Sequence, residues 1–91
     1  MTKPQARRLA IMAQDGMARA LRPVHTPLDG DIVFVGATGL RPLTDPTFSL
    51  SELGALAADV VARAIARGVY EARALPFPGV LPGWRDRFSA R

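Results

Sequence analysis

The feature that most constrains the fold is one short β-branched run with no second run to pair with. Residues 32–35 (Ile-Val-Phe-Val) are continuously apolar and are followed by Gly-Ala-Thr-Gly. A short run of this kind, without alternation, predicts a strand over about 31–37 that is covered on both faces. The rest of the 91-residue sequence contains no second convincing strand. We therefore expect other sequence to supply most of the sheet to which this strand belongs.

The sequence before the strand predicts a helix over about 4–21. Thr2 and Gln5 have the spacing of a capping box, and Pro4 lies early in the first turn, where its missing N–H costs nothing. Gly16 weakens a helix by about 1 kcal/mol relative to alanine, so something must favour a small residue there. One face of this helix is apolar at helical spacing: Leu9, Met12, Ala13, Met17, Ala20 and Leu21.

A second helix is predicted over about 50–72, with Ser49 and Glu52 as its capping box. Its larger apolar residues are expected to form one buried stripe: Leu53, Leu56, Val60, Ala64 and Ile65. Beside them runs a ridge of small residues, namely Gly54, Ala55, Ala58, Ala62 and Ala66. Because small residues permit close approach of a neighbouring helix, we expect packing on more than one side. Three charged residues interrupt the apolar run and exclude a membrane span: Asp59, Arg63 and Arg67.

Residues 75–91 predict an irregular C-terminal arm, because prolines and glycines recur along them. The arm is too apolar for a free linker, and its large residues are Leu75, Phe77, Val80, Leu81, Trp84 and Phe88. We expect it to lie across another surface, such as a partner subunit. Residues 1–91 are thus predicted to form a single partial domain of the α/β class, with two long helices, one or two strands and this arm.

Composition excludes several kinds of site and partner. The chain has no cysteine and one histidine, which excludes disulfides, thiolate sites and His-rich metal sites; no metal or cofactor is expected. Its net charge of +4 would suit nucleic acid. However, the arginines are scattered, and acidic residues four positions earlier (Asp15 before Arg19, Asp59 before Arg63) indicate solvated helix faces. We expect no nucleic-acid or membrane partner and, without a signal peptide, a cytoplasmic location.

The Asp29-Gly30-Asp31 run, directly before the strand, is the main candidate for chemistry. If the backbone is extended there, the two carboxylates project to one face and meet. The pKa of one would then rise, and the pair could share a proton or hold an ammonium group. Alternatively, the run forms a β-turn in which Asp29 bonds to its own backbone. The run is too short for a calcium loop.

Other polar residues offer weaker candidates. His25 is either a general base or a ring packed beside a turn, with one nitrogen bonded to the backbone. Thr26, Thr38 and Ser51 have no accompanying His–carboxylate arrangement, so the sequence does not support a self-contained Ser/His/Asp triad. Residues 36–39 have too few glycines and no lysine for a phosphate loop.

Three stretches in combination are distinctive. They are residues 8–20 (RLAIMAQDGMARA), residues 22–31 (RPVHTPLDGD) with Phe34 and the Ala-Thr-Gly of residues 37–39, and residues 53–65 (LGALAADVVARAI). Together they resemble the end of the L-aminopeptidase/D-esterase family, which includes β-peptidyl aminopeptidases and nylon-oligomer hydrolases. The likeness covers nearly the whole chain.

The resemblance implies a precursor that cleaves itself before a Ser or Thr, which becomes the N-terminal nucleophile of the smaller, C-terminal subunit. The α-amine of that residue can serve as base. It also implies a four-layer α/β/β/α sandwich, homo-oligomers, and a small peptide or amide substrate. In the nylon-hydrolase branch two aspartates near the nucleophile align with Asp29 and Asp31. The aminopeptidase branch has a hydroxyl and a glutamate there, so the substrate class stays open.

By this alignment the nucleophile and the oxyanion-hole residues lie upstream of Met1, and Thr2 matches a helix cap. We therefore expect a fragment of the sandwich that is inert alone and needs the remainder of the precursor, its larger subunit. Asp29 and Asp31 are its predicted supporting carboxylates. The alternative function is a small non-enzymatic helical interaction module, which the Ala-rich second helix and the Pro-rich arm fit. A basic nucleic-acid binder is a third, weaker alternative.

Overall fold

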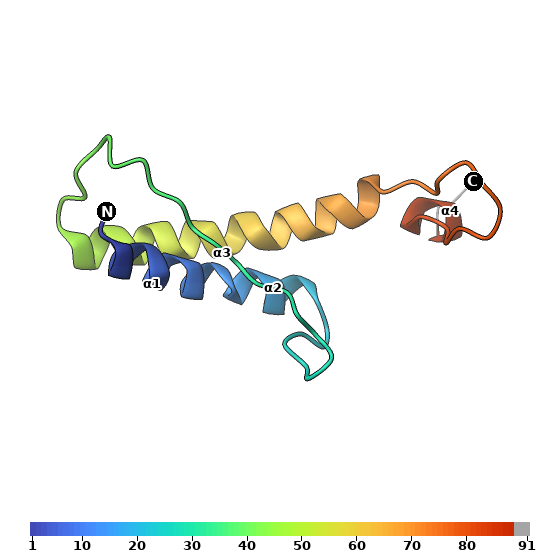
Figure 1. Cartoon of the computed structure of the whole chain (residues 1–91), viewed down its shortest axis with the longest axis horizontal. Helices are drawn as coiled ribbons and strands as arrows, with labels where there is room; N and C mark the ends of the chain where they lie inside the picture. The colour runs from blue at the N-terminus through green and yellow to red at the C-terminus, as the bar shows by residue number, and fades with distance from the viewer. Residues whose placement is uncertain (89–91) are drawn as a thin grey trace.

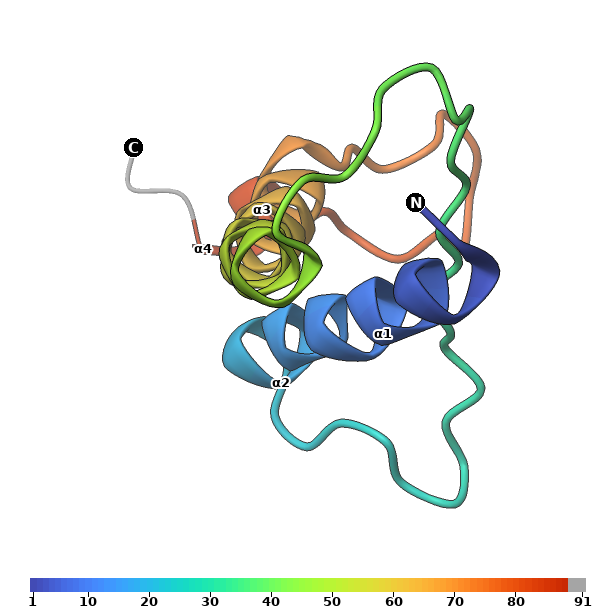
Figure 2. The ribbon, with the colours of Figure 1, turned by 90° about the vertical axis from the view of Figure 1, so that its left-hand side faces the viewer.

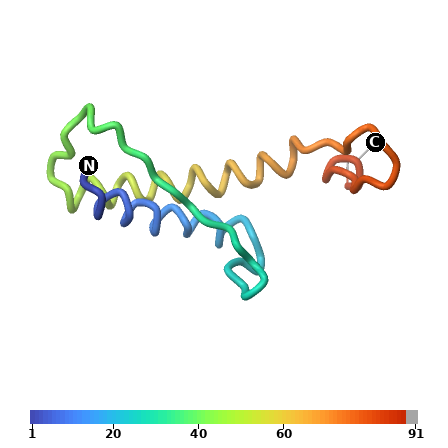
Figure 3. The backbone as a smooth tube through the Cα atoms, viewed as in Figure 1, coloured from blue at the N-terminus to red at the C-terminus, as the bar shows by residue number. Residues whose placement is uncertain are grey.

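The computed structural model describes residues 1–88, and helices are its regular elements: α1 (Lys3–Ala13), α2 (Asp15–Ala20), α3 (Pro46–Glu71) and α4 (Trp84–Phe88). Figure 1 shows α1 and α2 end to end along the first part of α3, with α4 beyond the far end of α3. A long segment leaves α2, loops outward and returns beside α1 before it enters α3 (Figure 3).

The first predicted helix begins as expected but is divided. Thr2 N–H donates to Gln5 Oε1 at 2.8 Å, and Gln5 N–H donates to Thr2 Oγ1 at 3.3 Å, which confirms the capping box. Instead of one helix over 4–21, α1 ends at Ala13 and α2 begins at Asp15. The N–H of Met17 donates to the Gln14 carbonyl at 3.0 Å, a tighter three-residue turn than an α-helix makes.

The second predicted helix starts four residues earlier than position 50, and its capping box is not formed. Pro46 occupies the first turn, where its fixed φ favours helix initiation, and Asp45 precedes it with φ 45°. Ser49 already lies inside the helix, and its hydroxyl donates to the Thr44 carbonyl at 2.6 Å. With 26 residues, α3 extends for about 39 Å.

The contact between α3 and the first two helices uses Gly54 and Ala58 of the predicted ridge of small residues, whereas Ala55 and Ala66 of that ridge are exposed. Figure 2 shows α1 and α2 on one side of α3. A Cβ on Gly16 would overlap the Ala58 carbonyl oxygen, and a Cβ on Gly54 would overlap the Met12 side chain. The predicted buried stripe is wrong, since Leu56 and Val60 are both more than 60% exposed. Within the described residues the buried apolar side chains are Ala13, Met17 and Ala58.

One ion pair supplements this contact. Arg19 Nη1 lies 2.6 Å from Asp59 Oδ1, so these residues link α2 to α3 instead of pairing within their own helices. Both side chains are more than half exposed, so the pair adds at most about 1 kcal/mol to stability. None of the helices in residues 1–88 combines the length and apolar character that crossing a bilayer requires.

The predicted irregular arm contains a short helix, which corrects the expectation for residues 75–91. It runs irregularly from Leu75 and then forms α4, while residues 89–91 of the predicted arm lie outside the described residues. The Asp86 carboxylate accepts the Gly83 N–H at 2.9 Å, a local hydrogen bond at the start of the helix.

The whole molecule exposes far more surface than a complete domain of its mass. Its accessible surface is 7631 Å², whereas a compact monomer of 9.8 kDa exposes about 5,200 Å². Its radius of gyration is 17.0 Å, against about 12 Å for a compact domain of this length. A narrow core and an excess of open surface are typical of one layer of a larger fold. The α/β/β/α sandwich stays a prediction.

Candidate active-site loop

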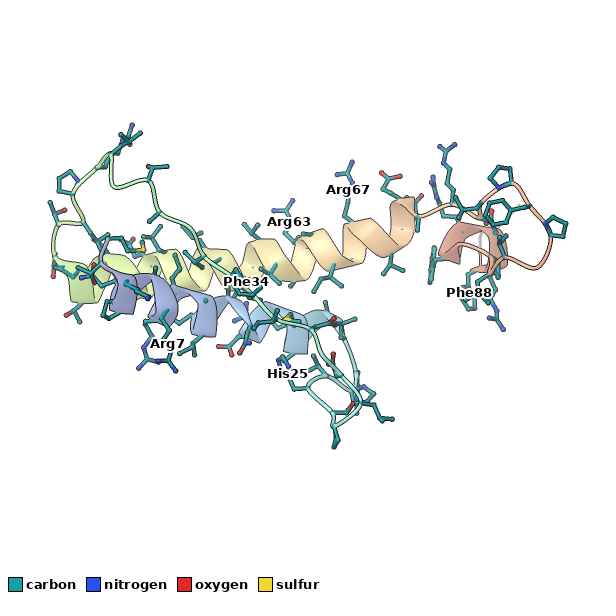
Figure 4. The ribbon with its side chains drawn as sticks, in the orientation of Figure 1. Arg7, His25, Phe34, Arg63, Arg67 and Phe88 are labelled. Atoms are coloured by element: carbon teal, nitrogen blue, oxygen red, sulfur yellow. The ribbon has the colours of Figure 1, made fainter. Side chains whose placement is uncertain are left out.

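The two predicted site residues lie in the loop that follows α2. Leu21 is extended, and Pro23 disfavours a helical conformation at Arg22, so the chain leaves the helix there. The loop then projects beyond the end of α2, where Figure 4 labels His25. Asp29 and Asp31 lie on its return toward the segment that contains Phe34.

Asp29 is the organising residue of this loop. Its N–H donates to the Thr26 carbonyl at 2.9 Å, which closes a four-residue turn. Its carboxylate accepts two backbone N–H groups, that of His25 on Oδ2 at 2.8 Å and that of Asp31 on Oδ1 at 3.0 Å. The structure thus forms the turn alternative, in which Asp29 bonds to its own backbone.

These hydrogen bonds decide the charge of Asp29. The backbone N–H of Asp31, and next that of His25, stabilise the carboxylate and lower the pKa of Asp29 below its ordinary value. The raised pKa expected of a proton-sharing pair is therefore not found at Asp29. The carboxylate is ionised at neutral pH and fixed in place.

Asp31 has a different environment. It is exposed, and it meets Asp29 through its own backbone N–H. The Asp31 side chain interacts with that of Asp29, the least of the causes that lower the pKa of Asp29, and no other hydrogen-bond partner of the Asp31 carboxylate is described within residues 1–88. The loop therefore presents the Asp29 carboxylate, which is hydrogen-bonded to the backbone, beside the Asp31 carboxylate, which is exposed and accessible to a ligand.

His25 contributes to the loop through its backbone, a role that the sequence interpretation missed. It adopts φ 57°, a conformation uncommon outside glycine, which Asn, Asp and His tolerate best. In this conformation its N–H points to the Asp29 carboxylate. A possible signal was the aspartate four residues after a histidine, across a turn with Pro27.

The hydroxyl candidates make only local contacts. Ser51 Oγ donates to the Thr47 carbonyl at 2.8 Å within α3. In residues 1–88 no hydrogen bond joins Thr26 or Thr38 to a histidine or a carboxylate, and no three His, Cys, Asp or Glu side chains cluster as metal ligands would.

The predicted strand continues from the site loop and lies beside α1. Val33 and Val35 are half-buried, whereas Ile32 and Phe34 are 63% and 82% exposed. This alternation is that of a strand with one face on a helix. The segment and α1 line a groove of about 660 Å³, near the Arg7 and Phe34 labels of Figure 4.

Both backbone edges of this segment are open. Within the described part of the chain, no backbone hydrogen bond involves residues 32–39. Backbone groups that become buried in folded proteins are almost always paired, so this segment could be buried in a larger fold only if neighbouring strands paired with it. The predicted strand over 31–37 is therefore not paired into a sheet within the described residues, and its pairing with strands from other sequence stays a prediction.

Comparison with known proteins identifies the class to which this loop and these helices belong. Residues 1–79 match Peptidase family S58, and the match covers α1 to α3 and both aspartates. The chain therefore belongs to Peptidase family S58, the L-aminopeptidase/D-esterase family that its sequence resembles.

Curated proteins similar to this chain carry aminopeptidase names. An uncharacterized aminopeptidase of Mycobacterium bovis is 46% identical over 92 residues, which cover 90% of this chain and 26% of the relative. An uncharacterized aminopeptidase of Mycobacterium leprae is 40% identical over 90 residues, with 84% of this chain and 25% of the relative covered. The chain thus spans about a quarter of the length of these relatives. No solved structure matches it significantly.

Proposed function

We propose that this chain is the C-terminal part of a self-processing amidohydrolase that cleaves amide bonds in peptides or oligoamides. Membership of a peptidase family and the aminopeptidase-named relatives support hydrolysis of this kind. The observation that supports it most directly is the loop in which Asp29 is immobilised and Asp31 is left open. The open edges of residues 32–39 support the need for a larger subunit.

The proposed chemistry is that of an N-terminal nucleophile. A Ser or Thr released by self-cleavage attacks the amide carbonyl, and its own α-amine takes the hydroxyl proton. The amine product leaves, and water then releases the acyl group from the hydroxyl. In this proposal the nucleophile and the oxyanion-hole donors come from the preceding part of the precursor, so the chain alone is inert. The location of the protein in the cytoplasm stays a prediction.

The two carboxylates have separate roles in this proposal. Asp31, exposed and without a described partner other than Asp29, orients the nucleophile's hydroxyl and holds its α-amine. Asp29 is already ionised and held by two N–H groups, so it fixes the loop and adds negative charge that attracts a substrate ammonium. A carboxylate positioned in advance requires little rearrangement when the substrate binds.

The proposal is tested in a chimera in which this chain replaces the matching quarter of the M. bovis relative. We expect self-cleavage on a denaturing gel and hydrolysis of aminoacyl anilides, neither of which the chain shows alone. Asp31→Asn is expected to lower kcat/KM by at least about 100-fold. Asp45→Asn is the matched control, because Asp45 is an exposed aspartate outside the loop and should leave activity unchanged.

Two outcomes would contradict this function. A correctly folded chimera that neither cleaves itself nor hydrolyses an amide would instead favour the non-enzymatic interaction module, which the exposed apolar stripe of α3 also fits. Full activity in Asp31→Asn or in Asp29→Asn would remove that residue from the catalytic group while leaving the reaction class intact.

A further inference from the structure

The two ends of the site loop are joined by one side chain. The Asp29 carboxylate accepts the N–H of His25, four residues earlier, on Oδ2 at 2.8 Å. It accepts the N–H of Asp31, two residues later, on Oδ1 at 3.0 Å. Because each oxygen holds a different backbone group, this carboxylate sets the separation of residues 25 and 31.

His25 reaches this carboxylate in an unusual backbone conformation. Its φ of 57° lies in the left-handed region, where the Cβ of an ordinary residue comes too close to the following carbonyl oxygen. Among the non-glycine residues of 1–88, Asp45 is the other residue with a positive φ, and it lies outside the loop. The unfavourable dihedral angle and the hydrogen bond that closes the loop therefore occur at the same residue.

The imidazole ring of His25 contributes less to the loop than its backbone does. The residue is exposed on the projecting loop (Figure 4), and within residues 1–88 the hydrogen bond described for it is that of its N–H. The charge of the ring lowers the pKa of Asp29, but by less than the N–H group of either His25 or Asp31. The structure therefore favours a backbone role for His25 over a role as general base.

The position of Asp31 depends on the same hydrogen bonds. A Cβ on Gly30, directly before it, would meet nothing within 4 Å. Directly after it, residues 32–39 make no backbone hydrogen bond in the described part of the chain. The bond from the Asp31 N–H to Asp29 is thus the hydrogen bond that fixes the backbone from which the Asp31 carboxylate projects.

We propose that His25 is a positioning residue for Asp31 and that it acts through its left-handed backbone rather than through its ring. This conformation directs the His25 N–H to Asp29, and Asp29 in turn holds the N–H of Asp31. The inference rests on the proposed function for the reaction that Asp31 serves, whereas the effect of His25 on the loop is independent of that function.

Three substitutions separate the backbone of His25 from its ring. His25→Gly removes the ring and keeps the conformation accessible, because glycine adopts a positive φ without a steric penalty. His25→Val also removes the ring, but a β-branched residue strongly disfavours a positive φ. Leu28→Val is the matched control, since it places the same side chain in the same loop at a residue that is 99% exposed and does not have a positive φ.

The first experiment measures the loop without catalysis. The Asp29 carboxyl carbon is titrated by NMR in the 91-residue chain and in the three variants. The midpoint should stay below the ordinary value in His25→Gly and Leu28→Val, and it should rise towards that value in His25→Val, because the His25 N–H is withdrawn. Equal midpoints in His25→Gly and His25→Val, or a higher one in His25→Gly, would overturn the proposal.

The second experiment measures catalysis in the chimera with the M. bovis relative, with rates normalised to self-cleaved enzyme. His25→Val should lower kcat for aminoacyl anilides about tenfold, whereas His25→Gly should stay within about threefold of the wild type. KM should change little, since Asp31 orients the nucleophile.

A ring that acts as general base would give the opposite result in the chimera. His25→Gly would then lose at least as much activity as His25→Val, and this outcome would exclude the backbone role. A wild-type chimera without activity would contradict the proposed function instead, while the NMR comparison would still decide the role of His25.

Discussion

At the scale of residues, the two aspartates of the site loop differ although only Gly30 separates them. The Asp29 carboxylate accepts one N–H group on each oxygen, those of His25 and Asp31, and the bond from His25 is made with a positive φ at His25. The Asp31 carboxylate is exposed. The backbone of the loop, rather than repulsion between two carboxylates, therefore decides which aspartate is open to a ligand.

The lowered pKa of Asp29 predicts how the loop depends on pH. Since the pKa in the folded loop lies below the unfolded value, ionised Asp29 stabilises the loop above the unfolded pKa. That contribution starts to fall below about pH 4 and is lost as the pH falls through the folded pKa. An NMR titration of the Asp29 carboxyl carbon should give a midpoint under the ordinary value, with the His25 amide shift following it. A midpoint at or above the ordinary value would contradict the hydrogen bonding. In Asp29→Asn the His25 amide shift should no longer titrate.

At the scale of elements, α3 has two faces with different uses. Its small residues let α2 approach until Gly16 touches the backbone of Ala58, and this contact contains most of the core. Its larger residues, among them Leu56 and Val60, point away from α1 and α2 and are open. One long helix thus packs inside this chain on one face and leaves the other face exposed.

The close crossing predicts that two Gly→Ala substitutions will have opposite signs. A Cβ on Gly16 would lie 2.8 Å from Val61 Cβ and still closer to the Ala58 carbonyl, which is backbone and cannot turn aside. Gly16→Ala should therefore lower the free energy of unfolding by about 1–3 kcal/mol. Gly68→Ala meets nothing within 4 Å and should raise it by about 0.5–1 kcal/mol.

Urea denaturation followed by far-UV circular dichroism measures both changes. If Gly16→Ala were as stabilising as Gly68→Ala, α2 and α3 would not approach as closely as the structure shows.

At the scale of the whole molecule, the chain exposes several apolar surfaces. The surface in excess of a compact monomer is about 2,400 Å². It includes the outer side of residues 32–35, the stripe of larger apolar residues on α3, and the aromatic side chains of Tyr70, Trp84 and Phe88. An open extended segment and an open helix face fit the strand and helix layers of the proposed sandwich.

This arrangement predicts different hydrogen exchange before and after assembly. In the chain alone, the amides of residues 32–39 should exchange at rates close to those of an unfolded peptide, because their N–H groups have no backbone partners. In the chimera with the preceding segment they should become strongly protected, whereas the solvent-facing amides of the site loop should change little. Protection already present in the chain alone, or none in the chimera, would contradict the predicted strand.

Several local features could be predicted from the sequence, and the predictions that are wrong have physical causes. The Thr2–Gln5 capping box is correct because it depends on residues within one turn. The Ser49–Glu52 box is wrong because Pro46 starts the helix first. For the site, the turn at Asp29 was one of two alternatives, and choosing between them required the backbone conformation of His25.

The amino-acid sequence by itself determined the family, the helical segments and the position of the two aspartates, and it predicts that residues 32–35 need other strands. These follow from short-range spacing and from residue combinations. Only the tertiary structure decided which small residues of α3 form the core and that α4 brings aromatic side chains together. It also decided that the Asp29 carboxylate is hydrogen-bonded to the backbone while the Asp31 carboxylate is exposed. Those outcomes depend on contacts between residues distant in the sequence, or on backbone dihedral angles, and periodicity alone contains neither.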